Sequence, residues 1–154
     1  MSESKPAPQL RDLPSTINHV SYVTDDMEKS LATFTALGAT DPVEFETSVA
    51  SIAMLKIPVG DHHLRVEIVM PKGKGNLFSD HMERRGPGLH HLGLSVPKFS
   101  DYFDALIAAG CIMKLDMRKA AIGSSGNAAR NQGFESCYLD CSPIGGPNLE
   151  LFGT

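Results

Sequence analysis

The chain has 154 residues, of which 42% are hydrophobic and 21% are charged, with a formal net charge of -4. This composition is typical of a globular domain with a sizeable core, and the acidic balance without a Lys/Arg run excludes nucleic acid as an expected partner. No apolar run approaches the roughly 18 residues of a membrane span, and the polar, proline-containing start is unlike a signal peptide. We therefore expect a cytoplasmic protein with no membrane partner.

The first 14 residues (1–14) are predicted to form a flexible arm. A strand, a short turn and an amphipathic helix follow in 17–39, where apolar side chains recur at helical spacing. Gly38 stands where a helix C-terminus favours a positive φ. The sequence therefore predicts a strand-helix unit that ends at this glycine.

Two further strands are predicted at 49–58 and 62–70, on either side of a turn at Val59-Gly60-Asp61. Residues 72–88 contain glycines and charged side chains and are interpreted as a linker with one helical turn. The first half thus contains one helix and at least three strands.

The second half repeats this pattern. Residues 89–111 align without a gap with the strand-helix unit of the first half, which places His19 opposite His91 and Gly38 opposite Gly110. They also read as an alternating strand, a turn and an amphipathic helix closed by glycine. Because the histidines coincide as well as the apolar pattern, we interpret the two halves as an internal repeat.

More strands are predicted at 134–141 and 147–153, while the glycine-rich stretch 123–133 lacks periodicity and is expected to form a loop. A helix followed by hairpin-like strands, twice, is typical of an α+β fold. We therefore expect one domain made of two modules, residues 15–84 (with the linker) and residues 85–154.

Three cysteines are present, Cys111, Cys137 and Cys141, an odd number without CxxC spacing. This pattern favours neither a disulfide framework nor a zinc knuckle. The sequence therefore predicts reduced thiols, in line with a cytoplasmic location.

Side chains alternate across a strand, so each strand histidine can be assigned to a face. In 89–96 His90 shares the face of the leucines at alternate positions, whereas His91 shares a face with small and polar residues. His19 occupies the matching face of the first strand. His19 and His91 are therefore the equivalent pair that we expect to line a cavity, and His90 is expected in the core or at an interface.

The last strand of each half carries a glutamate among apolar residues. Glu67 in LRVEIVM and Glu150 in NLELF each lie on the face opposite to the flanking aliphatic side chains. A lone glutamate in a strand is commonly solvated, but two at equivalent strands, beside two equivalent histidines, indicate a shared role. If the repeats pack about a pseudo-twofold axis, His19, Glu67, His91 and Glu150 converge in one cleft.

Two imidazoles and two carboxylates form a mixed nitrogen and oxygen donor set. Such a set suits one divalent ion of Ni, Co, Zn, Mn or Fe per chain, and it lacks the thiolates of a closed structural zinc site. An octahedral ion with four protein ligands keeps two positions for water or substrate. It can polarise a carbonyl so that the adjacent C–H is deprotonated to a metal-stabilised enolate. The sequence thus predicts a metal-dependent enzyme for a small carbonyl substrate.

Nearly the whole chain after residue 15 resembles the vicinal oxygen chelate (glyoxalase/bleomycin-resistance/dioxygenase) superfamily. The segments INHVSYVTDDMEKSLATFTALGA, VEIVMP, FSDHMERRGPGLHHLGLSV and NLELF are most similar to methylmalonyl-CoA epimerase. The resemblance implies paired βαβββ modules in a cupped mixed sheet, the metal ligands His19, Glu67, His91 and Glu150, and Glu150 as a catalytic base. It further implies a homodimer and an isomerase or epimerase whose substrate is an acyl-CoA or another small carbonyl compound.

Two positions differ from the epimerase pattern. Glu67 stands where epimerases more often have glutamine, and two histidines with two glutamates are also the ligands of bacterial nickel glyoxalase I. Epimerases use a second, non-ligand glutamate as a base on the strand before the second ligand, and the alignment places Ala53 there. Glu44 or Glu46 would supply this base if the register shifts.

Three alternatives to the isomerase hypothesis stay open. The ligand set also fits a glyoxalase I-like lyase that acts on a glutathione hemithioacetal. His19, His91 and Glu150 alone would form the iron site of an extradiol-type dioxygenase, although Glu67 would then occupy a position that O2 or catechol needs. Resistance-type members of the superfamily bind small molecules without turnover, and this chain would then be a binding protein.

Overall fold

The structure is a computed structural model that describes residues 13–117 and 135–153. The loop predicted at 123–133 and most of the arm predicted at 1–14 lie outside the described residues. No helix among the described residues is both long and apolar enough to cross a membrane.

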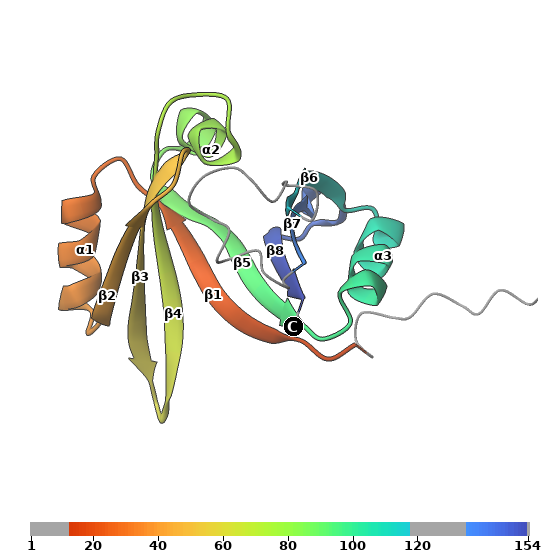
Figure 1. Ribbon diagram of the computed structural model, residues 1–154, viewed down its shortest axis with the longest axis horizontal. Helices are drawn as coiled ribbons and strands as arrows, with labels where there is room; N and C mark the ends of the chain where they lie inside the picture. Colours follow the sequence, from red (N-terminus) through yellow and green to blue (C-terminus); the bar gives the residue numbers. More distant parts are fainter. Residues whose placement is uncertain (1–12, 118–134, 154) are drawn as a thin grey trace, which may run out of the picture. The chain divides into compact units, whose positions relative to one another are not determined.

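The elements follow one another in the same order in both halves (Figure 1). The first half contains β1 (Thr16–Val23), α1 (Met27–Ala36), β2 (Thr40–Glu46), β3 (Ala50–Val59), β4 (His62–Pro71) and α2 (Leu77–Arg85). The second half contains β5 (Gly88–Val96), α3 (Phe99–Ala109), β6 (Ile112–Asp116), β7 (Ser136–Asp140), the 3-10 helix η3 (Ser142–Ile144) and β8 (Asn148–Gly153). This α+β order contains βαβββ twice, which confirms the predicted fold class.

The chain divides into two compact units, one of Asn18–Gly93 and the other of Met1–Ile17 with Leu94–Thr154. In the first unit the strand order is β2-β3-β4-β1-β5. β2, β3 and β4 are antiparallel neighbours, whereas β1 pairs with β4 in parallel, with Val20 opposite Val66. The sheet of this unit is therefore mixed.

α1 covers one face of this sheet (Figure 1). Its apolar stripe of Met27, Leu31 and Phe34 packs against a buried cluster on β3 and β4. The cluster consists of Ala39, Ala53, Leu55, Val66 and Ile68. The helix ends as the glycine signal predicts, because Gly38 has a φ of 95° directly after the C-cap residue. One face of β3 and β4 is thus committed to the core, which leaves the other face for the site.

α2 is longer than the single helical turn predicted for the linker. Asn76 starts it with a capping box: its Oδ1 accepts hydrogen bonds from the backbone N–H groups of Phe78 and Ser79, and the Ser79 Oγ accepts one from the Asn76 N–H. Phe78 and Ser79 are buried, Leu77 and Met82 are partly buried, and the last three residues of the helix are exposed. A buried first turn and its cap, rather than an apolar stripe, hold this helix.

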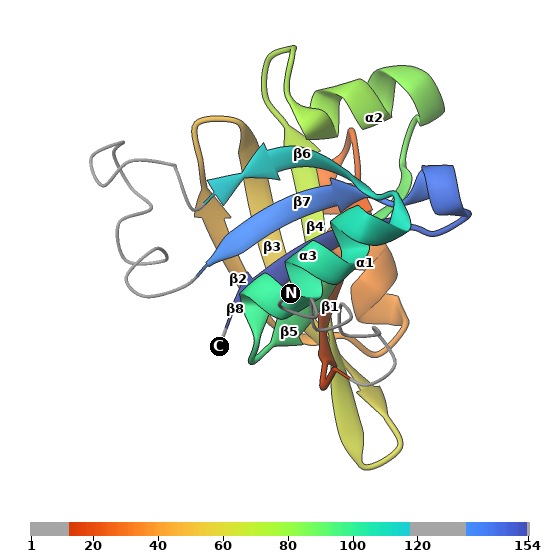
Figure 2. The ribbon, with the colours of Figure 1, turned by 90° about the vertical axis from the view of Figure 1, so that its right-hand side faces the viewer.

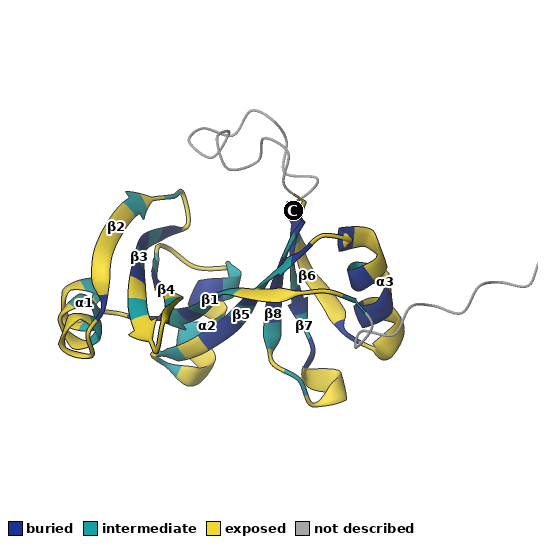
Figure 3. Ribbon diagram, turned by 90° about the horizontal axis from the view of Figure 1, so that it is seen from below, coloured by how far each residue is buried: buried dark blue, intermediate teal, exposed yellow. Residues whose placement is uncertain are grey.

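The second unit contains β8-β7-β6 as antiparallel neighbours. α3 packs on β8 through a buried face of Phe99, Tyr102, Ala105 and Leu106 (Figure 2). β6 is almost fully exposed, in contrast to β7 and β8 (Figure 3). The core of this unit therefore lies between α3 and the two inner strands.

Cys111 and Cys141 form a disulfide in this unit, while Cys137 is buried and does not take part in this disulfide. The prediction of three reduced thiols is wrong for this pair. Ile112 pairs with Asp140 in the β6–β7 ladder, so Cys111 and Cys141 occupy the next opposed positions, with Cα atoms 4.4 Å apart. The disulfide also withdraws the support that reduced thiols gave to a cytoplasmic location.

Candidate metal centre

His19 and Glu67 face the same side of the sheet of the first unit. β1 and β4 run in parallel with Ser21 opposite Glu67, and His19 lies two residues before Ser21 on the same strand face. The opposite face carries Val66 and Ile68, which belong to the cluster under α1. These two side chains, which the internal repeat predicts to converge, therefore share one face of the sheet.

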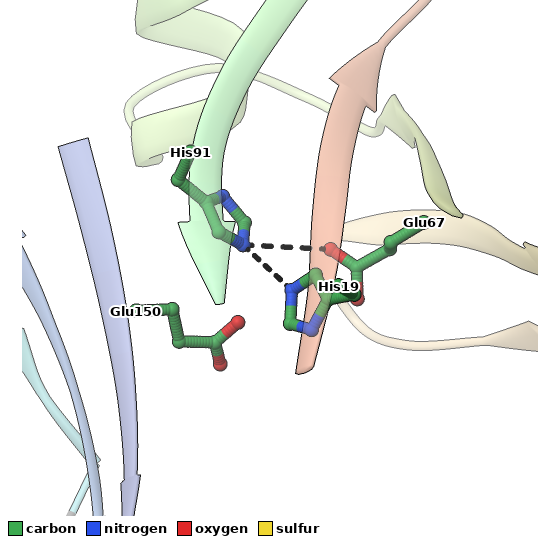
Figure 4. Close-up of side chains that lie close together, drawn as sticks. All are labelled: His19, Glu67, His91 and Glu150. Atoms are coloured by element: carbon green, nitrogen blue, oxygen red, sulfur yellow. Dashed lines mark hydrogen bonds and ion pairs between the residues drawn. The ribbon is translucent and has the colours of Figure 1, made fainter. Parts of the chain in front are cut away.

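His91 on β5 meets both of them (Figure 4). Its Nε2 lies 3.0 Å from His19 Nε2 and 3.9 Å from Glu67 Oε1, and one ligand atom of each residue lies within 4.8 Å of the others. All three side chains are buried: His19 is 2%, His91 3% and Glu67 6% exposed. Donors far apart in the sequence thus converge on one small volume.

These residues fit a divalent cation. Neutral imidazole nitrogens and a carboxylate oxygen are ligands that Ni, Co, Zn, Mn and Fe accept. Two Nε2 atoms at 3.0 Å repel through their lone pairs unless a proton or a cation lies between them. A buried carboxylate next to them adds negative charge that only a positive partner offsets. The arrangement is therefore chemically matched to a metal ion.

Each of these three side chains is held by a further polar contact. Ser21 Oγ donates to Glu67 Oε1 over 3.1 Å, Asn18 Oδ1 lies 2.9 Å from His19 Nδ1, and His90 Nδ1 lies 2.7 Å from His91 Nδ1. Strand alternation predicts that Ser21 lies on the ligand face, but the sequence does not show that its hydroxyl contacts Glu67. Such contacts orient ligands before a metal binds.

Glu150 belongs to the second unit, where it lies on β8. It is 6% exposed, and Ser136 Oγ on β7 donates to its Oε1 over 3.4 Å. The neighbouring Leu149 and Leu151 are buried as well. Glu150 is thus a buried carboxylate with a serine donor, as Glu67 is in the first unit.

The position at which the sequence alignment expects a second base does not face the metal ligands. Ala53 lies opposite Ile68 and is buried in the cluster under α1, so its side chain faces away from the metal ligands. The residue of β3 opposite Glu67 is Met54, and Ile52 and Lys56 share its face. The part of β3 beside the ligands therefore carries no carboxylate.

Glu44 and Glu46 do not replace it. In the β2–β3 ladder Glu44 lies opposite Ala53 and Glu46 opposite Ser51, so both glutamates belong to the α1 side of the sheet. Glu46 forms an ion pair with Lys72 and accepts a hydrogen bond from Ser51. The Lys72 ammonium, and then the Ser51 hydroxyl, hold the pKa of Glu46 below its ordinary value. These side chains belong to the exposed edge of the sheet.

Comparison with known proteins identifies the family of the chain. A family model, the Glyoxalase/Bleomycin resistance protein/Dioxygenase superfamily, matches residues 18–125, more than half of the chain. The chain belongs to this superfamily. The resemblance inferred from the sequence is therefore confirmed for the superfamily. No curated protein matches the sequence.

Solved structures of this fold include methylmalonyl-CoA epimerases. A variant of the Streptomyces coelicolor enzyme in complex with 2-nitronate-propionyl-CoA has a TM-score of 0.66 at 16% identity and covers 90% of this chain and 96% of its own. The Mycobacterium tuberculosis enzyme has a TM-score of 0.65 at 16% identity, with 97% and 92% covered. A hypothetical protein from Bacillus halodurans has a TM-score of 0.66 at 15% identity, with 91% and 94% covered. At these identities the likeness shows the fold alone.

Proposed function

We propose that this superfamily member is a divalent-metal-dependent isomerase that transfers a proton at the carbon next to a carbonyl group. The observation that carries the proposal is the convergence of His19, Glu67 and His91, whose donor atoms meet in a buried position. A buried set of nitrogen and oxygen donors is typical of a catalytic rather than a structural metal site.

Glu150 is the fourth ligand and the base in this proposal. It occupies the strand of the second repeat that corresponds to β4, it is buried, and it holds a serine hydrogen bond as Glu67 does. Buried carboxylates are retained in proteins where they are paired or coordinate a metal. These similarities support one role for both glutamates.

The four side chains would hold the ion, which when bound stabilises the negative charge that develops on a carbonyl oxygen. The Glu150 carboxylate removes the proton from the adjacent carbon and delivers it to the neighbouring carbon. Ser136 Oγ keeps one oxygen of this carboxylate engaged, which leaves the other oxygen for the proton. Burial of the ligands keeps water from competing for these groups.

The register of β3 favours a single base. Epimerisation needs one group that removes the proton and a second that delivers it on the opposite face of the carbon. Met54 and Ile52 stand beside Glu67 on the ligand face of β3 and exchange no protons. Lys56 on that face is exposed and paired with Asp41. We therefore favour a one-base isomerisation of the glyoxalase I type over a two-base epimerisation of an acyl-CoA.

The first test is elemental analysis of protein purified without a metal-affinity tag, for the wild type and for His91→Ala. The proposal expects about one divalent ion per chain in the wild type and its loss in the variant. His62→Ala, a change on the exposed start of β4, is the matched control and keeps the metal. A wild type that takes up neither Ni, Co nor Zn contradicts the proposal and favours the binding-protein alternative.

The second test follows hydrogen in D2O with two substrates, the hemithioacetal of methylglyoxal with glutathione, and methylmalonyl-CoA. A single base that carries the proton between neighbouring carbons leaves part of the original hydrogen in the product. Two bases on opposite faces place solvent deuterium in every inverted molecule. Turnover of methylmalonyl-CoA with complete deuterium incorporation would show that a second base exists and would reverse our preference.

A further inference from the structure

The residue before each ligand histidine contacts the Nδ1 atom of that histidine. Asn18 Oδ1 lies 2.9 Å from His19 Nδ1, and His90 Nδ1 lies 2.7 Å from His91 Nδ1. Asn18 and His90 are equivalent positions of the internal repeat, because the alignment of His19 with His91 also places them opposite each other. Two different residue types therefore make the same contact at the same place in both repeats.

This contact determines which ring nitrogen carries the proton. A carboxamide oxygen only accepts, so His19 donates from Nδ1 to Asn18 and keeps the lone pair on Nε2. Between His90 and His91 one Nδ1 donates and the other accepts. His91 Nε2 can bind a metal only when its own Nδ1 carries the proton and donates to His90.

His90 is well placed to accept that hydrogen bond. It is 6% exposed and lies between the ligand His91 and the first turns of α2. The rings of Phe78 and His81 lie against it, with centroid distances of 5.1 and 5.2 Å. These contacts fix the position of the His90 ring, so its Nδ1 stays directed at His91.

We propose that Asn18 and His90 are positioning residues that hold His19 and His91 in the Nδ1–H form and direct both Nε2 atoms at the metal. The proposal rests on the proposed function. His90 also has a second state. Without a bound metal, the 3.0 Å contact would let His91 donate from Nε2 to His19 Nε2, and His90 would then donate from Nδ1 to His91.

Metal binding therefore shifts two protons without changing their number. On binding, His91 moves its proton from Nε2 to Nδ1, and His90 moves its proton from Nδ1 to Nε2. Both rings stay neutral. The His90 ring allows this exchange because its nitrogens can trade donor and acceptor roles, whereas Asn18 presents its carboxamide oxygen to His19 in both states.

The first measurement is the tautomer of each ring by long-range 1H–15N correlation NMR, in metal-free and in zinc-loaded protein. We expect His19 as Nδ1–H in both states, and His90 as Nδ1–H without zinc and as Nε2–H with zinc. A His90 with a purely structural role keeps one tautomer throughout. That result, or a metal-free His19 in the Nε2–H form, overturns the proposal.

The second measurement is the affinity for Co(II) and Zn(II) by competition with a chelator. Loss of such an orienting partner typically weakens metal binding about 10-fold to 100-fold, and we expect this loss for His90→Leu and Asn18→Leu. His90→Asn installs the residue of the other repeat and restores affinity to within roughly threefold of the wild type. His81→Leu isolates the contribution of packing and should lose less affinity, because it removes a half-buried ring that lies against His90 but makes no hydrogen bond to His91 among the described residues.

The outcomes separate this proposal from the proposed function. Equal affinities of the wild type, His90→Leu and Asn18→Leu overturn the positioning roles while the metal site stands. An equal loss in His90→Asn and His81→Leu assigns the effect to packing and also overturns them. A wild type without metal affinity contradicts the proposed function. Even then, the tautomer of His19 in metal-free protein tests the contact with Asn18.

Discussion

Gly93 is required for the position of the His19 ring. It lies on β5 two residues after His91, and therefore on the same strand face. A Cβ at this position would lie 2.8 Å from His19 Nε2 and nearer still to Nδ1 and Cε1. The ring thus packs directly on the β5 backbone, and any side chain at position 93 pushes it away.

We expect Gly93→Ala to displace His19 from the donor group. Overpacking of this kind costs about 1–3 kcal/mol, and the free energy of unfolding should fall by that amount, with weaker Co(II) binding in addition. Urea denaturation and metal titration measure the two effects. Gly88→Ala on the same strand is the control, because a Cβ there comes no closer than 4.0 Å to any neighbour, His81 Nε2 being the nearest. Equal behaviour of the two variants would contradict this account.

Strand alternation was sufficient to predict the face of His19 and of Glu67 within their own strands, and the internal repeat supplied the prediction that the two side chains meet. It could not predict Gly93, since a small residue in a strand gives no signal until the ring that packs on it is known. The alignment with the epimerase pattern placed Ala53 beside the ligands, where the structure has Met54. A shift of one residue reverses a face, and only the partner strand sets the register.

At the scale of elements, the cap of α2 holds the helix that lies against His90. Asn76 Oδ1 accepts from two backbone N–H groups of the first turn. Asn76→Ala removes both acceptors and should lower the free energy of unfolding by about 1 kcal/mol. Chemical denaturation checks this value. Lys98→Ala is the control, because Lys98 is the N-cap of α3 and makes no side-chain hydrogen bond there, so the change should cost little.

His81 gives α2 a pH-dependent contribution to stability. Burial, and then the positive charge of Arg85, lower the pKa of His81 below its ordinary value of 6.5. Above pH 6.5 the His81 ring is neutral in both the folded and the unfolded chain, so His81 does not lower the free energy of unfolding. As the pH falls below about 6.5 the unfolded chain binds the proton first, and stability decreases until the lower, folded pKa is passed.

We therefore expect the wild type to lose more stability than His81→Leu as the pH falls from about 7 to about 5. The free energy of unfolding of the variant rises relative to that of the wild type over this range. Thermal denaturation of the metal-free proteins at several pH values measures it. His62→Leu, a histidine on an exposed part of β4, serves as the control and should follow the wild type. A constant difference between wild type and His81→Leu over this range would show that His81 titrates normally.

Elements with their own periodic signal were predictable. The hairpin of β3 and β4 lies within about one residue of the predicted strands, and α1 and α3 end at their glycines. β2 carries polar residues and Pro42, and its strand conformation comes from pairing with β3 rather than from its composition. α2 has its apolar residues mainly in its first turn and charged residues at its end, so the glycines and charges around it dominated the sequence reading of this segment.

At the scale of the whole molecule, the disulfide is the feature that could not be predicted from the sequence. Spacing alone gave no reason to pair Cys111 with Cys141, which are 30 residues apart. The antiparallel pairing of β6 with β7 brings the start of one strand to the end of the other and so opposes the two cysteines. The repeat predicts the strands, but a cross-strand pair depends on their register, which the sequence does not fix.

This disulfide has a measurable consequence for the purified protein. Without reductant, the denatured chain should show one reactive thiol, that of Cys137, and its intact mass should rise by two hydrogen atoms on reduction. Cross-linking a loop of this length removes entropy from the unfolded chain, so Cys111→Ser with Cys141→Ser should lower the free energy of unfolding by about 3–4 kcal/mol. Dithiothreitol should produce the same loss in the wild type and none in the double variant. Three reactive thiols in the untreated wild type would instead restore the sequence prediction of reduced cysteines.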